Sequence, residues 1–264
     1  MPRILMCEPT YYNIEYEINV WMSRLNVAKA DLARAQWNNL YDTLTQRCGV
    51  TVERIEPVKG LPDLVFTANA GLVDGRRFIL SRFRFPARSG EEPVFAKWFR
   101  EHGYEVIELP EGAFFEGAGD ALECNGHLFA GYHFRTEIHS HAVVGEILGR
   151  RVLSLQLVDP RYYHLDTCFC PLSDGTLVWY PPAFDEYARR VIEEYVPNRI
   201  EVSDHDAARF GCNAVCVDRH VVVSAGCTQL MNDLSSHGFT VHSVNLSEFL
   251  KSGGSAKCLT LRLD

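Results

Sequence analysis

Residues 62–82, PDLVFTANAGLVDGRRFILSR, combine a hairpin pattern with one polar residue that does not fit it. The first half is mostly apolar, Asp74-Gly75 is a typical hairpin turn, and RRFILSR follows as a returning strand. We therefore predict two strands around a turn. Asn69 lies within the first strand, where an unpaired buried amide would cost roughly 2–7 kcal/mol. This position therefore needs a partner or a function.

The same pattern recurs along the chain. Each copy starts with small and polar residues, then alternates apolar residues around a turn: FEGAGDALECNGHLFAGY (115–132), YHLDTCFCPLSDGTLVWY (163–180) and FGCNAVCVDRHVVVSAG (210–226). The polar starting residues Asn69, Asp120, Asp166 and Asn213 are 51, 46 and 47 residues apart, and a further 45 residues lead to Cys258. This fifth copy has no room for its second strand, so the N-terminal PRILMCEP is expected to supply it.

A helical pattern and a strand separate successive hairpins in all five intervals. The helices are expected to stop at Gly49, Gly103, Gly149 and Gly238, and at Pro197 in the fourth copy. Five copies of strand, hairpin and helix predict an α/β propeller with pseudo-five-fold symmetry around a central site. Residues 1–264 would form a single domain, because the first strand completes the last repeat. An ordinary open α/β sheet would not explain the matched spacing.

Composition limits the classes of partner. The chain is 47% hydrophobic and carries a net charge of −8, which argues against nucleic acid or an anionic membrane as its partner. No apolar run approaches the ~20 residues of a membrane span. The nine cysteines form no regular framework and several lie in apolar strands, which indicates a reducing cytoplasm. Cys168, Cys170, Cys212 and Cys216 lack the histidine spacing typical of zinc sites, so we expect no metal and no cofactor. Homo-oligomerisation is left open.

The polar starts of the repeats would converge on the ring axis. They hold Asn69, Glu116 with Asp120, His164 with Asp166, Asn213 and Cys258. We place His164 and Asp166 on a strand, where residues two apart share a face. Gly253 and Gly254 let the backbone before Cys258 approach a ligand closely. A cysteine and a histidine ringed by carboxylates suit a cationic substrate with an electrophilic carbon, such as a guanidinium.

Four segments in this order, PDLVFTAN, FEGAGD, HLD and GGSAKC, resemble the guanidine-modifying enzymes of the pentein fold. These include arginine deiminases, dimethylarginine dimethylaminohydrolases and amidinotransferases. The resemblance implies that Cys258 is the nucleophile and His164 the general acid and base, with Glu116 and Asp166 around the guanidinium. It also implies that Asp63 holds the substrate α-amino group and that Arg88 and Arg135 hold its α-carboxylate.

Asn69 departs from the deiminase pattern, which has a carboxylate at this place. An amide both donates and accepts, so it suits a neutral ureido group as well as a guanidinium. FTANAG and the N-terminal YYNIEYEINVWM are similar to arginine dihydrolases, which implies conversion of arginine to ornithine, carbon dioxide and two ammonia in two attacks by Cys258. Asn69 would be catalytic and Asn19 would contribute to the substrate site.

Two other functions are weighed against this one. A single-step deiminase, dimethylargininase or amidinotransferase would make a different product from the same site. A binding protein on the same ring would be expected to have lost the cysteine, histidine and carboxylates, which are all present.

Overall fold

The computed structural model describes residues 1–264 and contains five three-stranded sheets. Every sheet has the same pattern, with an antiparallel pair of strands followed by a parallel third strand. In sheet order the strands are β3 (Gly71–Asp74), β4 (Arg77–Leu80), β5 (Glu105–Ile107); β6 (Ala121–Cys124), β7 (His127–Tyr132), β8 (Val152–Gln156); β9 (Phe169–Pro171), β10 (Leu177–Trp179), β11 (Arg199–Glu201); β12 (Val215–Val217), β13 (His220–Ser224), β14 (Thr240–Val244); and β15 (Leu261–Arg262), β1 (Arg3–Cys7), β2 (Thr51–Ile55). The predicted five-fold repeat is confirmed.

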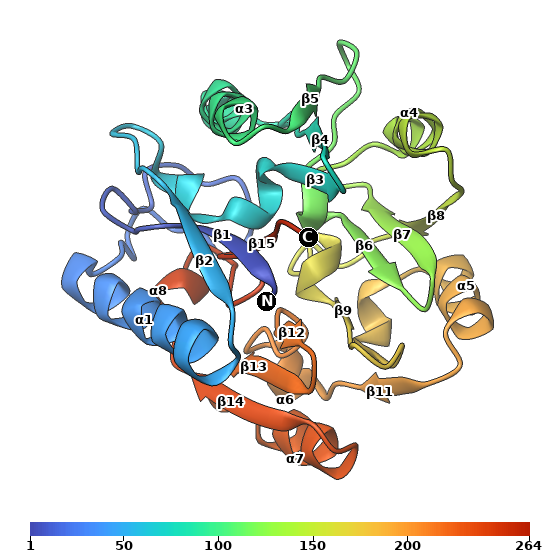
Figure 1. Ribbon diagram of the computed structural model, residues 1–264. Helices are drawn as coiled ribbons and strands as arrows, with labels where there is room; N and C mark the ends of the chain where they lie inside the picture. The colour runs from blue at the N-terminus through green and yellow to red at the C-terminus, as the bar shows by residue number, and fades with distance from the viewer.

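The N-terminal strand lies in the fifth sheet, as predicted. β1 pairs with β15 on one side and with β2 on the other. Figure 1 shows the five sheets arranged around the middle of the molecule, with both ends of the chain near that middle. The two ends of the sequence therefore share one repeat.

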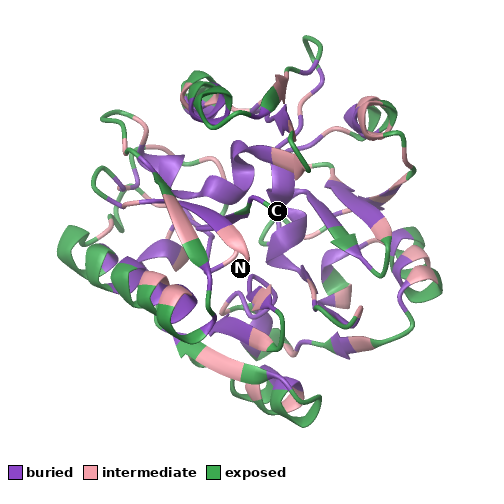
Figure 2. Ribbon diagram, in the orientation of Figure 1, coloured by how far each residue is buried: buried purple, intermediate pink, exposed green.

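A helix connects the two parallel strands of every sheet and lies on the outside (Figure 1). These helices are α1 (Ala30–Asp42, continued by a π-helical turn Thr43–Arg47), α3 (Glu92–Glu101), α4 (Ile138–Leu148), α5 (Glu186–Tyr195) and α7 (Thr228–Ser236), and the short helices are α2 (Pro86–Ser89), α6 (Asp204–Ala207) and α8 (Ser247–Leu250). Gly49, Gly103, Gly149 and Gly238 all adopt positive φ after their helices, which confirms the predicted helix ends. Buried residues fill the space between sheets and helices, while the outer helix faces are exposed (Figure 2).

Two local predictions are wrong. Residues 62–70 are not a strand: they form short 3₁₀ helices at Pro62–Val65 and Thr67–Ala70, and β3 begins only at Gly71. His164 and Asp166 do not lie on a strand either, because a 3₁₀ turn covers Leu165–Thr167. Apolar, β-branched composition alone cannot distinguish a buried turn from a buried strand.

The five anchor turns are linked by hydrogen bonds. Each turn lies just before the first strand of its sheet, and its central polar residue is almost completely buried. The bonds run from each repeat to the next and from the fifth back to the first: Asn69 Nδ2 to Glu116 O (3.4 Å), Leu165 N to Asp120 Oδ1 (3.0 Å), Asn213 Nδ2 to Asp166 O (3.0 Å), Asn213 Nδ2 to Cys258 Sγ (3.1 Å) and Ala68 N to Cys258 O (3.2 Å). The expected convergence of these positions is therefore observed.

No helix in the structure has the length and apolar character needed to cross a bilayer.

Candidate active site

Cys258 lies in the fifth anchor turn and is held by the side chains of two neighbouring repeats. Asn213 Nδ2 donates to Sγ at 3.1 Å, while its Oδ1 accepts from the Cys258 backbone N–H at 3.2 Å. The thiol lies 3.5 Å from Asp166 Oδ2. Asn213 therefore fixes both the backbone and the sulfur atom of Cys258.

The electrostatics around Cys258 favour a neutral thiol. Burial raises the pKa of Cys258 well above its ordinary value, and the negative charge of Asp166 raises it further. Burial also raises the pKa of Asp166 to about 6, against the opposing influence of Lys257. A cation placed beside these two groups would favour the thiolate and the carboxylate together. A cationic ligand bound here would therefore promote the ionisation of Cys258, which burial and the charge of Asp166 otherwise oppose.

His164 is paired with a buried carboxylate. Its Nε2 lies 2.7 Å from Glu116 Oε2, which also accepts from Arg135 Nη1 at 3.1 Å. Burial alone would raise the pKa of Glu116, but the charge of Arg135 and the hydrogen bond to His164 outweigh it and hold the pKa well below its ordinary value. Glu116 is therefore ionised and fixes the orientation of the imidazole. The Arg135 guanidinium lies between the rings of Phe85 and Tyr163, 4.9 and 4.7 Å from their centroids.

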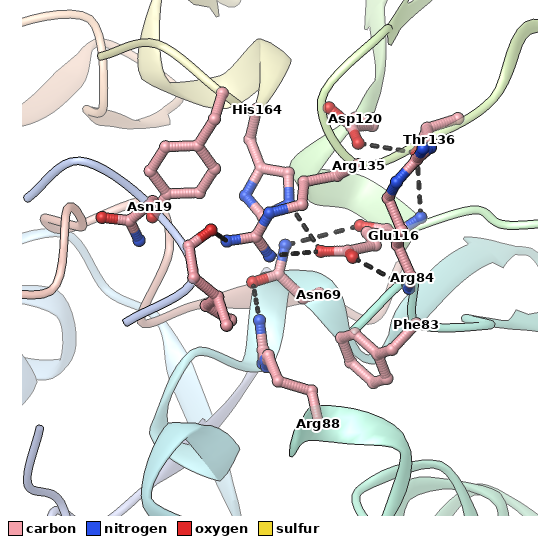
Figure 3. A network of polar contacts seen from close by, with 12 residues as sticks. Asn19, Asn69, Phe83, Arg84, Arg88, Glu116, Asp120, Arg135, Thr136 and His164 are labelled. Carbon is pink, nitrogen blue, oxygen red and sulfur yellow. Dashed lines mark hydrogen bonds and ion pairs between the residues drawn. The ribbon is translucent and has the colours of Figure 1, made fainter. Parts of the chain in front are cut away.

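Asn69 has two protein partners, so its amide is not unpaired. Figure 3 shows it between Arg88 and Glu116. Its Oδ1 accepts from Arg88 Nη1 at 2.9 Å, and its Nδ2 donates weakly to the Glu116 carbonyl at 3.4 Å. A Cβ on Gly119 would come within 2.2 Å of Asn69 Nδ2, so the glycine makes room for this amide. The oxygen of the Asn69 amide is therefore already hydrogen-bonded to Arg88, whereas the NH₂ group makes only one long hydrogen bond.

Arg88 itself is bound by a carboxylate that the sequence did not reveal. Glu91 accepts from Arg88 Nε at 2.8 Å and from Nη2 at 2.7 Å. The bidentate face that we expected to hold a substrate carboxylate is therefore occupied in this structure. Both residues lie in the segment RSGEE, which resembles an exposed helix start, so no sequence signal identified the pair.

Asp63 lies beside Arg88 and near the buried Tyr16 hydroxyl, and one of its oxygens makes no hydrogen bond. Its Oδ2 is 3.9 Å from Arg88 Nε, whereas Oδ1 is buried and makes no hydrogen bond. Burial raises the pKa of Asp63, and the charge of Arg88 partly opposes the shift. A ligand ammonium group would complete the pairing of this carboxylate.

A narrow cavity brings most of the predicted residues together. It is lined by Ile18, Asn19, Asp63, Phe66, Asn69, Arg88, Arg135, Tyr163, His164, Ser252, Gly254 and Cys258. Glu116 and Asp166 do not line it, since they lie behind His164 and Cys258. The cavity holds about 10 Å³, roughly one water molecule. A larger cavity of about 430 Å³ beside Lys257 contains none of the predicted site residues.

The N-terminal segment covers this cavity. Ile18 O accepts from Arg135 Nη2 at 3.1 Å, and Asn19 Nδ2 donates to Ser252 O at 3.0 Å. Asn19 Oδ1 accepts from the backbone N–H groups of Trp21 and Met22. The segment from Glu8 to Lys29 has no helix or strand of its own, so individual hydrogen bonds such as Trp21 Nε1 to Arg161 O at 2.7 Å hold it over the site.

The chain is similar to curated proteins along nearly its whole length. It is 51% identical to the bifunctional arginine dihydrolase/ornithine cyclodeaminase ArgZ of Synechocystis sp., over 99% of this chain but only 37% of ArgZ. It is 41% identical to the N(G),N(G)-dimethylarginine dimethylaminohydrolase of Mycobacterium tuberculosis, over 99% of this chain and 85% of that protein.

A solved structure and a family description agree with these relatives. The crystal structure of a mutant N-terminal domain of ArgZ, bound to substrate, matches with a TM-score of 0.96 and 49% identity, covering 100% of this chain and 98% of that one. The family described as N,N dimethylarginine dimethylhydrolase, eukaryotic, matches residues 9–263. With nearly the whole chain matched, the chain belongs to the N,N dimethylarginine dimethylhydrolase family.

Proposed function

We propose that the chain is an arginine dihydrolase that converts arginine and two water molecules to ornithine, carbon dioxide and two ammonia. The observation that carries this proposal is Asn69, whose amide stands beside the Cys258 and His164 pocket with its oxygen bound to Arg88. The 51% identity to ArgZ supports the same function.

Cys258 is the proposed nucleophile. The arginine guanidinium brings the cation that favours the thiolate, which attacks the guanidinium carbon. His164 protonates the leaving ammonia and then removes a proton from water, which displaces sulfur from the thiouronium intermediate and gives citrulline. Asp166 lies 3.5 Å from the sulfur and Glu116 2.7 Å from the imidazole. Asp166 would attract the cation, and Glu116 would hold His164.

The second hydrolysis depends on keeping the neutral citrulline in place. A urea carbonyl needs hydrogen-bond donors, whereas a guanidinium needs acceptors. Asn69 offers its NH₂ group because Arg88 already binds its oxygen. Cys258 then attacks the ureido carbon and displaces the second ammonia, and water hydrolyses the resulting thiocarbamate to a carbamate that loses carbon dioxide and leaves ornithine.

The remaining residues are proposed to bind the amino-acid end of the substrate. Asp63 has a buried unpaired oxygen for the α-ammonium group. Arg135 is proposed to bind the α-carboxylate. Arg88 can also bind this carboxylate only if it gives up a hydrogen bond to Glu91 or to Asn69. Asn19 lines the same cavity. Because that cavity has room for only about one water molecule, the segment carrying Ile18 and Asn19 must move aside when arginine enters.

We further propose that residues 1–264 act as one catalytic domain on a small-molecule substrate in the cytoplasm. The shared sheet of β15, β1 and β2 supports the single domain, and nine free cysteines support a reducing compartment.

A dimethylarginine dimethylaminohydrolase is the second candidate, favoured by the matched family and by the 41% identical mycobacterial relative. The test is incubation of the purified chain with arginine, citrulline or N,N-dimethylarginine, with Cys258→Ser as the blank. Two ammonia per ornithine from arginine, without citrulline build-up, is the expected result. Citrulline as the final product would overturn the dihydrolase proposal, and dimethylamine release from the methylated substrate alone would establish the second candidate.

A further inference from the structure

Cys48, His220 and His242 meet where the fourth sheet faces the fifth repeat, and none of them lines the catalytic pocket. β13 and β14 are parallel with Val222 opposite His242, so the two histidines lie two residues apart in register and on the same face. Cys48 follows the π-helical turn Thr43–Arg47, and its side chain packs in the same apolar cluster as Val222. Three separate elements thus bring these side chains together.

The three ligand atoms are already close. One from each residue lies within 4.8 Å of the other two. His220 Nδ1 and His242 Nε2 are 3.0 Å apart, with nearly parallel rings. In tetrahedral zinc sites, Zn–N bonds of about 2.0 Å and Zn–S bonds of about 2.3 Å place neighbouring ligand atoms roughly 3.3–3.7 Å apart. To reach this geometry Cys48 would have to come closer by up to about 1 Å, and both imidazoles, whose nitrogens now point at each other, would have to turn toward the ion.

The simplest alternative is a hydrogen bond between two histidines beside a buried apolar cysteine. That arrangement pairs one nitrogen of each imidazole but leaves the Cys48 thiol, which is 6% exposed, without a partner. Neither histidine forms an ion pair with a carboxylate, so no acidic residue accounts for their approach. A metal ion would use the thiol and both imidazoles at once.

We propose that Cys48, His220 and His242 form a zinc-binding site that is separate from the catalytic pocket. Thiolate and imidazole ligands together suit Zn²⁺, with water as the fourth ligand. On coordination the thiol releases its proton to solvent. Cys48 follows α1, which connects β1 to β2, whereas both histidines belong to the fourth sheet. The ion therefore cross-links the fourth repeat to the repeat that contains both ends of the chain.

The probes for this site are Zn²⁺ and Co²⁺ added to the metal-free chain. We expect one bound equivalent by equilibrium dialysis, a thiolate-to-cobalt charge-transfer band, and a rise in Tm with Zn²⁺. Cys48→Ser should lose the band and bind Zn²⁺ at least about tenfold more weakly, since a hydroxyl is a poor ligand for this ion. His242→Ala should weaken binding similarly while leaving the thiolate in place.

Cys258→Ser is the matched control, because Cys258, His164 and Asp166 are also metal-binding side chains. This variant should keep the charge-transfer band and the rise in Tm. Arginine turnover of Cys48→Ser should equal that of the wild type. No Zn²⁺ binding at micromolar concentrations, or binding that survives Cys48→Ser and is lost in Cys258→Ser, would overturn the proposal. If Cys48→Ser does not fold, the dialysis and Tm measurements on His220→Gln and His242→Ala test Zn²⁺ binding at this site instead.

Discussion

Replacing Asn69 by Asp tests whether this amide decides between one hydrolysis and two. The change keeps the volume and keeps the acceptor for Arg88 Nη1, now 2.9 Å away, while turning the NH₂ group into a charged oxygen. That oxygen would face the Glu116 carbonyl across 3.4 Å, where two acceptors repel each other. The first hydrolysis should tolerate the anion because the guanidinium is cationic.

The second hydrolysis should slow because the ureido oxygen of citrulline loses its donor. A buried group left without its hydrogen bond loses about 1–3 kcal/mol of binding free energy, and an unpaired charge loses more. At ~1.4 kcal/mol per factor of ten, the second step should slow by about tenfold or more. Asn69→Asp should therefore accumulate citrulline from arginine.

The assay follows arginine, citrulline and ornithine by chromatography over the time course. Asn38→Asp is the matched control, since it makes the same change on the exposed face of α1 and should behave as the wild type. Thermal unfolding of both variants establishes that they fold. Ornithine formation by Asn69→Asp at the wild-type rate, with no transient citrulline, would refute this account of the amide.

Four further outcomes are expected. Cys258→Ser should lose turnover, because a hydroxyl is a much weaker nucleophile near neutral pH, and intact-mass analysis after acid quench should find the wild-type adduct on Cys258 and on no other cysteine. Gly119→Ala places a Cβ 2.2 Å from Asn69 Nδ2, so it should displace the amide and raise the citrulline-to-ornithine ratio; an unchanged ratio would contradict this packing. Since burial raises the pKa of Asp166 to about 6, kcat/KM should fall as the pH drops below about 6 and the carboxylate becomes neutral, and a pH–rate profile that is flat there would contradict it. Exhaustive chelation should leave arginine turnover unchanged, because the substrate supplies its own positive charge, and an inactive metal-free enzyme rescued by zinc would disprove this.

The sequence by itself determined the repeat architecture. Turn residues, helix-ending glycines and apolar alternation act over a few neighbouring residues, so they can be read along the chain. Their spacing also predicted that Asn69, His164 and Cys258 would meet, because equivalent positions in a repeat occupy equivalent places in space. The shared sheet of β1 and β15 followed from the missing strand of the fifth copy.

Local pattern was insufficient where burial overrides propensity. Residues 62–70 are apolar enough for a strand, yet they form two 3₁₀ turns, in which the Asn69 side chain is paired within the site. The same is true of the 3₁₀ turn after His164. A buried segment satisfies its backbone through contacts with other repeats, and those contacts are not encoded in its own composition.

Only the tertiary structure decided which side chains pair. Glu91 occupies the bidentate face of Arg88, Arg88 in turn fixes the oxygen of Asn69, and Asn213 holds Cys258. Most of the decisive contacts join residues far apart in sequence, such as Asn213 and Cys258, and their strength depends on burial and on distances of a few tenths of an ångström. The sequence therefore placed the reactive groups in one pocket, whereas the fold set their charges, their orientation and the space left for a substrate, because those quantities arise only when the repeats pack together.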